Sequence, residues 1–285
     1  MLGSPRLYRH SARHVRSMQA LIAPPARPWP PQWLVPDWPA PPGVRAVFTT
    51  RAGGVSQAPW DTLNLGDHVG DDAAQVAANR RILRDATGAQ PVFMQQPHGT
   101  DCVDLDRLDG PAPRADACCT TRAGLACTVM VADCLAVFLC DVRGEAVAVA
   151  HAGWRGLAGG VLESCVGGLR ARLADRRTPL LAWLGPCIGP DAFEVGDEVR
   201  QAFVATDPHA QACFRPGAIP GKWWADLAGL ARRRLRSAGV EALYGNDATP
   251  AWCTVGDASR FFSHRRDAVR LGSTGRMAAS IWREA

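Results

Sequence analysis

Apolar residues along the chain fall into short segments, and the pattern within each segment predicts its secondary structure. Val- and Ala-rich segments bounded by turn residues predict strands at 44–50, 125–132, 135–140, 145–150, 180–184 and 276–282. Segments with helical spacing of apolar residues predict helices at 71–88, 157–174, 196–205 and 224–238. Because no internal repeat or low-complexity block interrupts this series, the chain is predicted to form one α/β domain.

The first 40 residues differ in composition from the rest of the chain. Between residues 24 and 42, nine of nineteen residues are proline, and three tryptophans are interleaved with them. Proline fixes φ and lacks a backbone donor, so this segment cannot be regular helix or central strand. We therefore expect residues 1–40 to form an unstructured, basic, Pro- and Trp-rich extension that at most wraps the surface, and residues 41–285 to form the folded domain.

The positive charge of the chain is concentrated near its start. The formal net charge is +5, and residues 1–36 hold five arginines and no acidic residue, so the remaining 27 basic residues (32 − 5) balance the 27 acidic ones. A neutral domain gives no support for a nucleic-acid partner. Since no run of about 18 apolar residues occurs, we also expect no membrane span.

The ten cysteines contain no C-x-x-C pair, and most lie in apolar segments such as 125–131. Cysteine in such surroundings behaves as a small hydrophobic residue. This usage indicates a reducing compartment rather than a disulfide framework. The short apolar stretch at 18–23 runs into prolines and does not resemble a secretory signal, so we expect a cytoplasmic protein.

Two predicted strands bring a cysteine and a histidine together. They flank residues 141–144 (DVRG), a turn with Asp first and Gly last. Paired residues of an antiparallel hairpin have a constant number sum, and 141 + 144 equals 134 + 151. Cys134 and His151 are therefore predicted to face each other, with Cβ atoms about 4.5 to 5.5 Å apart. A slip of one residue would place them on opposite faces.

A thiolate and an imidazole at that distance can share a metal ion, or can act as nucleophile and base. His98, in the segment 94–100 (MQQPHGT), is the third candidate ligand, because Gly99 beside it allows the loop to turn the imidazole inward. Two histidines and one cysteine leave the fourth tetrahedral position of zinc open, as in catalytic sites. We expect zinc as the ion, with copper as the alternative.

Two arginines lie in glycine-rich turns that could hold an anion. Arg155 follows His151 where the predicted strand passes into a helix, and the start of a helix presents free backbone N–H groups. Arg51 lies in the segment 49–56 (TTRAGGVS). Each arginine alone is typical of a surface residue. If both lie near the metal, they would suit a phosphate or a ribose-bearing substrate.

Motifs that match a known family run in order from about residue 44 to residue 282. ADCL at 132–135 and AHAGWRGL at 150–157 look like metal motifs, and the second is long enough to be highly specific. The others are TTRAGGVS at 49–56, LNLG at 63–66, LGPCIGP at 184–190, FEVG at 193–196, FFSHRRD at 261–267 and TGRM at 274–277. On these motifs the chain closely resembles the YfiH, or laccase-domain, family of purine nucleoside phosphorylases.

This resemblance implies a single-domain, four-layer α/β sandwich with mixed or antiparallel sheets, in which residues 41–285 are the catalytic domain. It implies that His98, Cys134 and His151 bind zinc, and it adds Asn64 of the LNLG motif to Arg51 and Arg155 as candidate substrate- or phosphate-binding residues. The implied activities are phosphorolysis of adenosine, inosine and methylthioadenosine, with deamination of adenosine as a second reaction. A purine nucleoside and phosphate are the implied partners, and we expect a monomer or a small homo-oligomer.

The chain departs from the family pattern at three places. Pro97 stands before His98 where the family usually has Val, which removes a backbone donor beside a ligand. His264 replaces a usual Tyr, and residues 268–273 look like a short insertion. The first departure concerns the geometry of the metal, and the other two concern the wall of the pocket.

The residues allow a picture of both reactions. In deamination, zinc would lower the pKa of a water to about 7 for attack on the purine carbon that bears the amino group. In phosphorolysis, phosphate held by arginines would attack the anomeric carbon of ribose as the base leaves. Asp133, next to Cys134, is an open candidate for the group that protonates the leaving base.

Other functions remain as alternatives. Some members of the family are described as copper polyphenol oxidases, but the chain has only seven histidines, two of them in its first 14 residues, which are too few for several copper centres. A metal-free Cys134–His151 hydrolase or deamidase is the main enzymatic alternative, and a peptidoglycan-editing hydrolase is another. The third is a non-catalytic metal-binding module. Metal content together with a nucleoside assay separates them.

Overall fold

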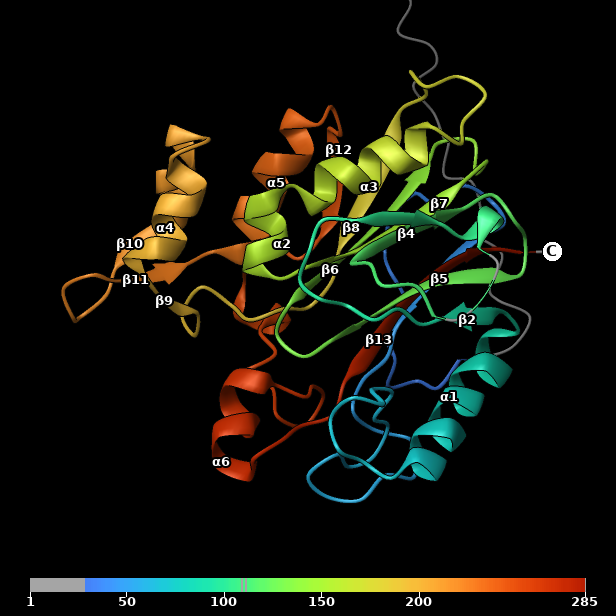
Figure 1. Ribbon diagram of the computed structural model, residues 1–285, viewed down its shortest axis with the longest axis horizontal. Helices are drawn as coiled ribbons and strands as arrows, with labels where there is room; N and C mark the ends of the chain where they lie inside the picture. Colours follow the sequence, from blue (N-terminus) through green and yellow to red (C-terminus); the bar gives the residue numbers. More distant parts are fainter. Residues whose placement is uncertain (1–28, 109, 111, 285) are drawn as a thin grey trace, which may run out of the picture.

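Two β-sheets stacked face to face form the centre of the part of the chain that the structure describes, residues 29–108, 110 and 112–284 of this computed structural model (Figure 1). The larger sheet has six strands in the order β12-β8-β6-β7-β4-β3. Its four central strands are antiparallel, and each edge strand is parallel to its neighbour. The strands are β3 (Cys102–Asp104), β4 (Ala117–Thr120), β6 (Leu135–Asp141), β7 (Val147–Ala152), β8 (Leu180–Leu184) and β12 (Ala242–Gly245).

The smaller sheet has four strands in the order β1-β13-β5-β2, and only the pair of β2 and β5 is parallel. They are β1 (Val44–Phe48), β2 (Gln90–Val92), β5 (Leu125–Val131) and β13 (Met277–Arg283). A third, antiparallel sheet lies to one side of the molecule, at the left of Figure 1. It consists of β9 (Glu194–Gly196), β10 (Phe214–Pro216) and β11 (Lys222–Ala225).

The helices are mostly short, and the first follows its sequence signals closely. The side chain of Asp72 accepts hydrogen bonds from two backbone N–H groups at the start of α1, and Gly88 ends the helix at φ 69°. The helices are α1 (Ala73–Thr87), α2 (Trp154–Gly159), α3 (Val161–Arg170), α4 (Asp197–Val204), α5 (Leu227–Ser237) and α6 (Val269–Leu271). The 3₁₀ segments are Leu105–Arg107, Pro208–Cys213 and Pro250–Trp252, and His264–Ala268 is a π-helical turn.

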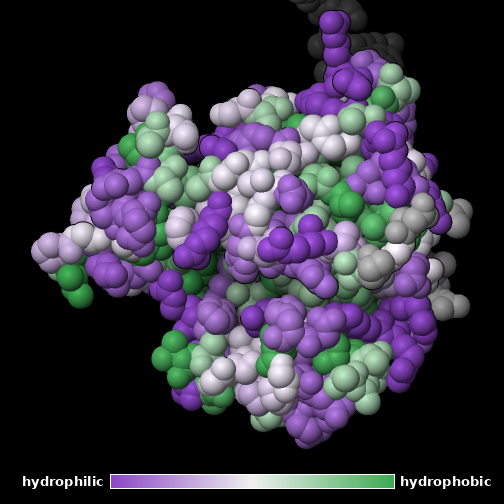
Figure 2. Space-filling view, in the orientation of Figure 1, coloured by the Kyte–Doolittle hydropathy of each residue, from purple (hydrophilic) through white to green (hydrophobic). Residues whose placement is uncertain are grey.

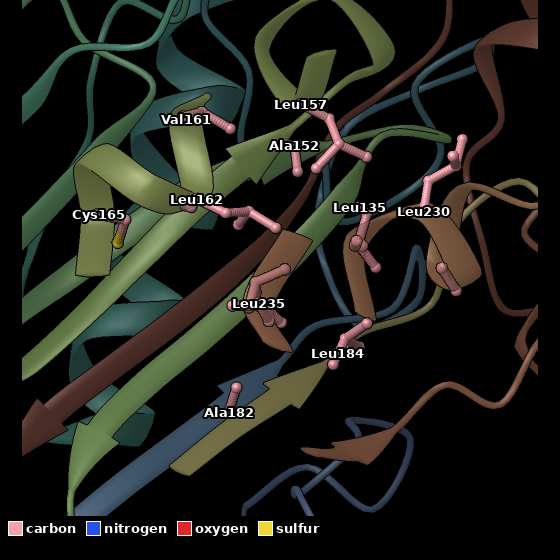
Figure 3. Close-up of a cluster of buried hydrophobic side chains, with 14 of the residues drawn as sticks. Leu135, Ala152, Leu157, Val161, Leu162, Cys165, Ala182, Leu184, Leu230 and Leu235 are labelled. Carbon is pink, nitrogen blue, oxygen red and sulfur yellow. The ribbon is translucent and has the colours of Figure 1, made fainter. Parts of the chain in front are cut away.

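Side chains of β6 alternate between two cores, because successive residues of a strand point to opposite faces. Leu135 and Val137 face the helix-side core, which α2, α3 and α5 close (Figure 3). Ala136 and Phe138 face the inter-sheet core, where they pack with residues of the smaller sheet such as Ile281. Both faces of β6 are therefore apolar, which explains its continuous hydrophobic sequence.

A third core covers the outer face of the smaller sheet, where Leu83 of α1 and Trp33 pack against Val47 and Trp282. The layers are therefore α1, the four-stranded sheet, the six-stranded sheet, and the helices α2, α3 and α5. This arrangement confirms the expected layered α/β sandwich with mixed and antiparallel sheets.

Two predicted helices have different bounds in the structure. The helix expected at 157–174 is two helices, because Gly160 adopts φ 107° between α2 and α3, and α2 begins earlier, at Trp154. The helix expected at 224–238 begins at Leu227, since residues 222–225 form β11. The capping side chain of Asp226 marks that helix start and was overlooked.

The tryptophan-rich segment from residue 29 to residue 40 is part of the folded structure. Trp33 and Trp38 are 5% and 7% exposed. The rings of Trp29 and Trp282 lie 5.8 Å apart, and Leu34 forms a β-bridge with Phe48. The expectation of an unstructured extension through residue 40 is therefore wrong for this segment, because tryptophan burial stabilises a chain that prolines keep extended. Residues 1–28 lie outside the described residues.

Within the described ranges, no helix is long and apolar enough to cross a membrane.

Candidate metal centre

The hairpin of β6 and β7 carries the site, but its register differs from the prediction. His151 pairs with Ala136, so the number sum is 287 and Cys134 lies just before β6 instead of opposite His151. The cause is the connection. The side chain of Asp141 accepts hydrogen bonds from the backbone N–H groups of Arg143 and Ala146, so residues 141–146 form the loop and pairing begins at Cys140 and Val147. A shift of two keeps both side chains on the same face of the sheet.

The three predicted ligands lie together. The ligand atoms of His98, Cys134 and His151 are all within 4.8 Å of one another, and Cys134 Sγ is 3.8 Å from His98 Nε2. Bonds of about 2.0 to 2.3 Å at tetrahedral angles put ligand atoms about 3.3 to 3.8 Å apart, so small side-chain shifts would close the site on an ion. The donor set suits a borderline-soft ion, with a fourth position left over for water or substrate.

The backbone around the ligands is shaped to bring them close. His98 and Asp133 have φ values of 63° and 82°, a region that residues other than glycine rarely adopt. A Cβ atom on Gly153 would lie 2.8 Å from His98 Cδ2 and 3.0 Å from Cys134 Sγ. Only glycine therefore fits at position 153, which explains one of the glycines of the AHAGWRGL motif.

Asp116 is a site residue that sequence reasoning missed. Its fully buried carboxylate lies 2.8 Å from His151 Nδ1, and it accepts hydrogen bonds from the backbone N–H groups of His98 and Gly99. When Nδ1 of His151 donates to Asp116, Nε2 is left free to bind an ion. The only signal in the sequence is an acidic residue directly before the apolar strand β4, so its role depends on the fold.

Cys134 and His151 form a strongly interacting pair. Burial alone would raise the pKa of the Cys134 thiol, but the charge of His151 and hydrogen bonds from both histidines lower it to about 6. Burial alone would lower the pKa of His151, but the Cys134 thiolate and Asp116 raise it to about 9. In the absence of an ion the pair is therefore a thiolate and an imidazolium near neutral pH.

The ligands open into a cavity of about 330 Å³. On the face shown in Figure 2, the surface is hollowed between the part that carries α2 and the part that carries α6. Apolar and cationic side chains share the cavity wall. Besides the three ligands, the lining residues are His68, Gln96, Met130, Ala132, Asp133, Gly153, Trp154, Ile188, Phe193, Leu227, His264, Arg265 and Arg276.

Three other predicted residues are not among the described residues that line the cavity. Arg51 donates to Asp61 and to the carbonyl of Ala258. Arg155 is exposed, with its guanidinium carbon 4.4 Å from the ring centre of Trp154. Asn64 is fully buried and bonds to backbone and side-chain groups of the loop around it.

Asp133 does line the cavity, and both oxygens of its carboxylate accept hydrogen bonds. It accepts hydrogen bonds from the hydroxyls of Thr254 and Ser263 and from the backbone N–H of Arg265. This geometry holds the segment after Phe262 against the cavity. It leaves Asp133 with a positioning contact rather than a free oxygen.

Of the three positions expected to depart from the family pattern, His264 lines the cavity, and neither Pro97 nor the segment 268–273 is among the described lining residues. Pro97 precedes His98, whose own N–H is held by Asp116. His264 begins the π-helical turn and lines the cavity, and the segment 268–273 continues it into α6. Val269 of α6 is 91% exposed, so this part of the segment lies at the surface.

Fold and site together define a single-domain α/β protein with a two-histidine, one-cysteine site of the metal-binding type. A family model described as multi-copper polyphenol oxidoreductase laccase matches residues 45–284. The chain belongs to this family, the YfiH or laccase-domain family.

Named relatives cover nearly the whole domain. The chain is 50% identical over 250 residues to "Purine nucleoside phosphorylase PA4543" of Pseudomonas aeruginosa, covering 88% of this chain and 98% of the relative. It is 47% identical over 251 residues to "Purine nucleoside phosphorylase YfiH" of Escherichia coli, covering 87% and 98%. Among solved structures, Neisseria meningitidis protein NMB0706 matches with a TM-score of 0.81 and 44% identity, covering 89% of this chain and 100% of that chain.

Proposed function

We propose that this protein is a zinc-dependent purine nucleoside phosphorylase that acts on adenosine, inosine and methylthioadenosine and also deaminates adenosine. The observation that carries the proposal is the convergence of His98, Cys134 and His151 at one cavity. Three protein ligands would leave the fourth position of zinc for water or substrate. The relatives named purine nucleoside phosphorylase support the reaction class. We place the enzyme in the cytoplasm because its ten cysteines are all free.

Phosphorolysis breaks the bond between the anomeric carbon of ribose and the purine nitrogen, while a phosphate oxygen forms a new bond to that carbon. The purine leaves with a proton. His98, Cys134 and His151 would hold zinc, which supplies a Lewis acid and, for deamination, lowers the pKa of water. Asp116 fixes the tautomer and orientation of His151.

The rest of the cavity suits a nucleoside in size and chemistry. A volume of about 330 Å³ lies within the range of small-molecule sites. Trp154, Phe193 and Met130 offer apolar surface to a purine ring, and a purine enclosed there is shielded from water. The polar lining groups, such as Gln96 and Arg276, are then available to ribose and phosphate.

The second candidate is a metal-free hydrolase or deamidase. It is favoured by one observation, the chain of contacts from Cys134 to His151 to Asp116, in which the pKa of the thiol is lowered to about 6. A cysteine nucleophile, an imidazole and an orienting carboxylate are the parts of a covalent hydrolase.

One experiment separates the two candidates. The purified protein is assayed for zinc. Release of hypoxanthine and formation of ribose 1-phosphate from inosine are then followed with and without phosphate. A phosphorylase is expected to hold about one zinc per chain and to require phosphate. Turnover that proceeds at the same rate without phosphate and after zinc removal would refute the proposal and favour the hydrolase.

A further inference from the structure

The cavity wall contains an arginine whose charge has no carboxylate partner. Among the described residues, no Asp or Glu oxygen lies within ion-pair distance of Arg276, although fifteen ion pairs involve other side chains. Its Nη1 donates to the carbonyls of Thr274 and Gly275, while Nε and Nη2 have no partner in the described part of the chain. Burying a guanidinium whose N–H donors have no partner costs free energy, and an anion that accepts hydrogen bonds from those donors offsets this cost.

The other arginines near the site are committed to protein contacts. Arg265 lines the cavity but donates to the carbonyls of Ala192 and Glu194. Arg51 is paired with Asp61, and Arg155 is exposed outside the lining. Arg276 is thus the lining arginine whose Nε and Nη2 both lack a partner in the described part of the chain, whereas both terminal nitrogens of Arg265 donate to carbonyls.

The LNLG motif holds Arg276 in place. The side chain of Asn64 accepts a hydrogen bond of 2.9 Å from the backbone N–H of Arg276, and the N–H of Leu65 donates to the carbonyl of Arg276. Gly66 leaves room for the arginine side chain, because a Cβ atom there would lie 2.7 Å from Arg276 Cγ. The motif therefore fixes the backbone of Arg276 by hydrogen bonds, and Gly66 leaves space for the arginine side chain that lines the cavity.

We infer that Arg276 is the anion-binding residue of the cavity and that it holds the phosphate cosubstrate, with Asn64 and Gly66 as its positioning residues. The inference rests on the proposed phosphorolysis. A guanidinium presents N–H donors in a planar fork that matches two oxygens of phosphate, and such charge-assisted bonds are stronger than neutral ones. Burial lowers the pKa of Arg276, while the nearby charges of Cys134 and Asp133 raise it. An arginine side chain stays protonated at the pH of the assay, so Arg276 can serve as a fixed positive charge.

The test compares Arg276→Gln and Arg276→Lys with wild type and with Arg84→Gln, which changes an exposed arginine of α1 that is not among the lining residues. Initial rates are measured with phosphate and inosine varied separately. Arg276→Gln is expected to raise the KM for phosphate at least tenfold and the KM for inosine less than threefold. Arg276→Lys should restore part of the loss, and Arg84→Gln should behave as wild type.

A second pair of variants tests the positioning role without altering a charge. Gly66→Ala places a methyl group against Arg276 Cγ, so it should also raise the KM for phosphate. Gly167→Ala is the matched control, because a Cβ atom at Gly167 on α3 meets nothing within 4 Å. A Gly66→Ala protein with an unchanged KM for phosphate would contradict the positioning role of Gly66.

Equilibrium binding keeps the inference separate from the proposed function. Inorganic phosphate is titrated into zinc-loaded wild type and Arg276→Gln by calorimetry, and zinc content and melting temperature are checked for each protein. Equal phosphate affinity in folded, zinc-loaded Arg276→Gln would overturn the assignment even if wild type is a phosphorylase. A wild type that binds phosphate through Arg276 but turns over inosine without it would refute the phosphorylase proposal and leave the anion site standing.

Discussion

A single carboxylate organises the metal centre at the scale of residues. Asp116 orients the His151 ring through one oxygen and fixes the backbone of His98 and Gly99 through both. Two ligands from distant segments are thereby held by one buried group. Outer contacts of this kind set ligand orientation and basicity, so their loss affects a site almost as strongly as loss of a ligand.

Changing Cys134 to Ala should remove both bound zinc and phosphorolysis, because a site with two imidazoles retains too few protein ligands. Metal analysis of the purified variant and a ribose 1-phosphate assay check this outcome. Cys213→Ala is the control, since Cys213 is half-buried and is not part of the three-ligand cluster. Full zinc content and activity in Cys134→Ala would remove the proposed site.

Changing Asp116 to Asn should weaken zinc binding by about 10- to 100-fold, because the neutral amide orients His151 less firmly. Competition with a chelator measures the affinity. Thr121→Ala is the control. It removes a side chain that hydrogen-bonds to Asp106 and forms no hydrogen bond with the three ligands. An unchanged zinc affinity would mean that Asp116 contributes only to folding.

Zinc-free protein should show thiolate reactivity at Cys134 with a midpoint near pH 6, well below that of an ordinary thiol. The thiolate is present above this midpoint and lost as pH falls through it, so the stability that the pair contributes is also lost on acidification. On the alkaline side the contribution of His151 fades as pH rises through about 9. Iodoacetamide alkylation followed from pH 4 to pH 10 measures this profile, and a midpoint near 8.5 would contradict the ion pair.

At the scale of elements, the site depends on where strands stop and helices begin. β6 starts one residue after Cys134, and α2 starts three residues after His151, so both ligands lie at strand ends beside the cavity. α2 is short because the chain turns at Gly160 into α3. This break lets α2 lie beside the cavity while α3 packs along the large sheet through residues such as Leu162.

Gly160→Ala tests this break. Gly160 adopts φ 107°, a conformation in which alanine is strained, so the variant should unfold at lower urea with a loss of more than about 1 kcal/mol. Gly167→Ala on α3 has a helical conformation and free space around it, so it should be neutral or slightly stabilising. Equal stabilities of the two variants would contradict the role of Gly160 as a required turn.

At the scale of the whole molecule, the cavity forms where separate layers meet. The loop before His98 and the end of β5 contribute the inter-sheet side, and α2 contributes the helix side. A further part of the wall comes from His264, Arg265 and Arg276. Three other positions along the chain contribute Ile188, Phe193 and Leu227. No single segment of the chain contains the site, so its integrity depends on the packing of all layers, including the tryptophan-rich segment on the outer face.

A chain that begins at Asp37 should therefore be less stable than the intact chain, because it lacks Trp33 and its contacts in the outer core. Trp33→Ala tests the same contact without truncation, and it should cost about 3 to 5 kcal/mol of unfolding free energy. Val35→Ala is the control, because Val35 is 56% exposed. Chemical denaturation measures the unfolding free energy of all three proteins. A truncated chain as stable as the intact one would show that the segment does not contribute to stability.

The sequence alone was sufficient for features that depend on neighbouring residues. The apolar patterns predicted β1, α1 and the strands β5 to β8. This was possible because the side chains that each element buries recur at a spacing that is visible within the segment itself. The same holds for the candidate ligands, since His98, Cys134 and His151 each lie in a short motif with glycine or a strand end beside it. The outline of the four-layer fold followed from a family resemblance carried by those motifs.

Other features were decided only by the tertiary structure, because they depend on residues far apart in the chain. Asp116 and His151 are 35 residues apart, and Asn64 and Arg276 are 212 apart, so no local pattern signals either contact. The hairpin register was set by the side chain of Asp141, whose hydrogen bonds stabilise a loop longer than the predicted turn at 141–144. The burial of Trp33 likewise required a sheet face that forms only when β1 and β13 pair.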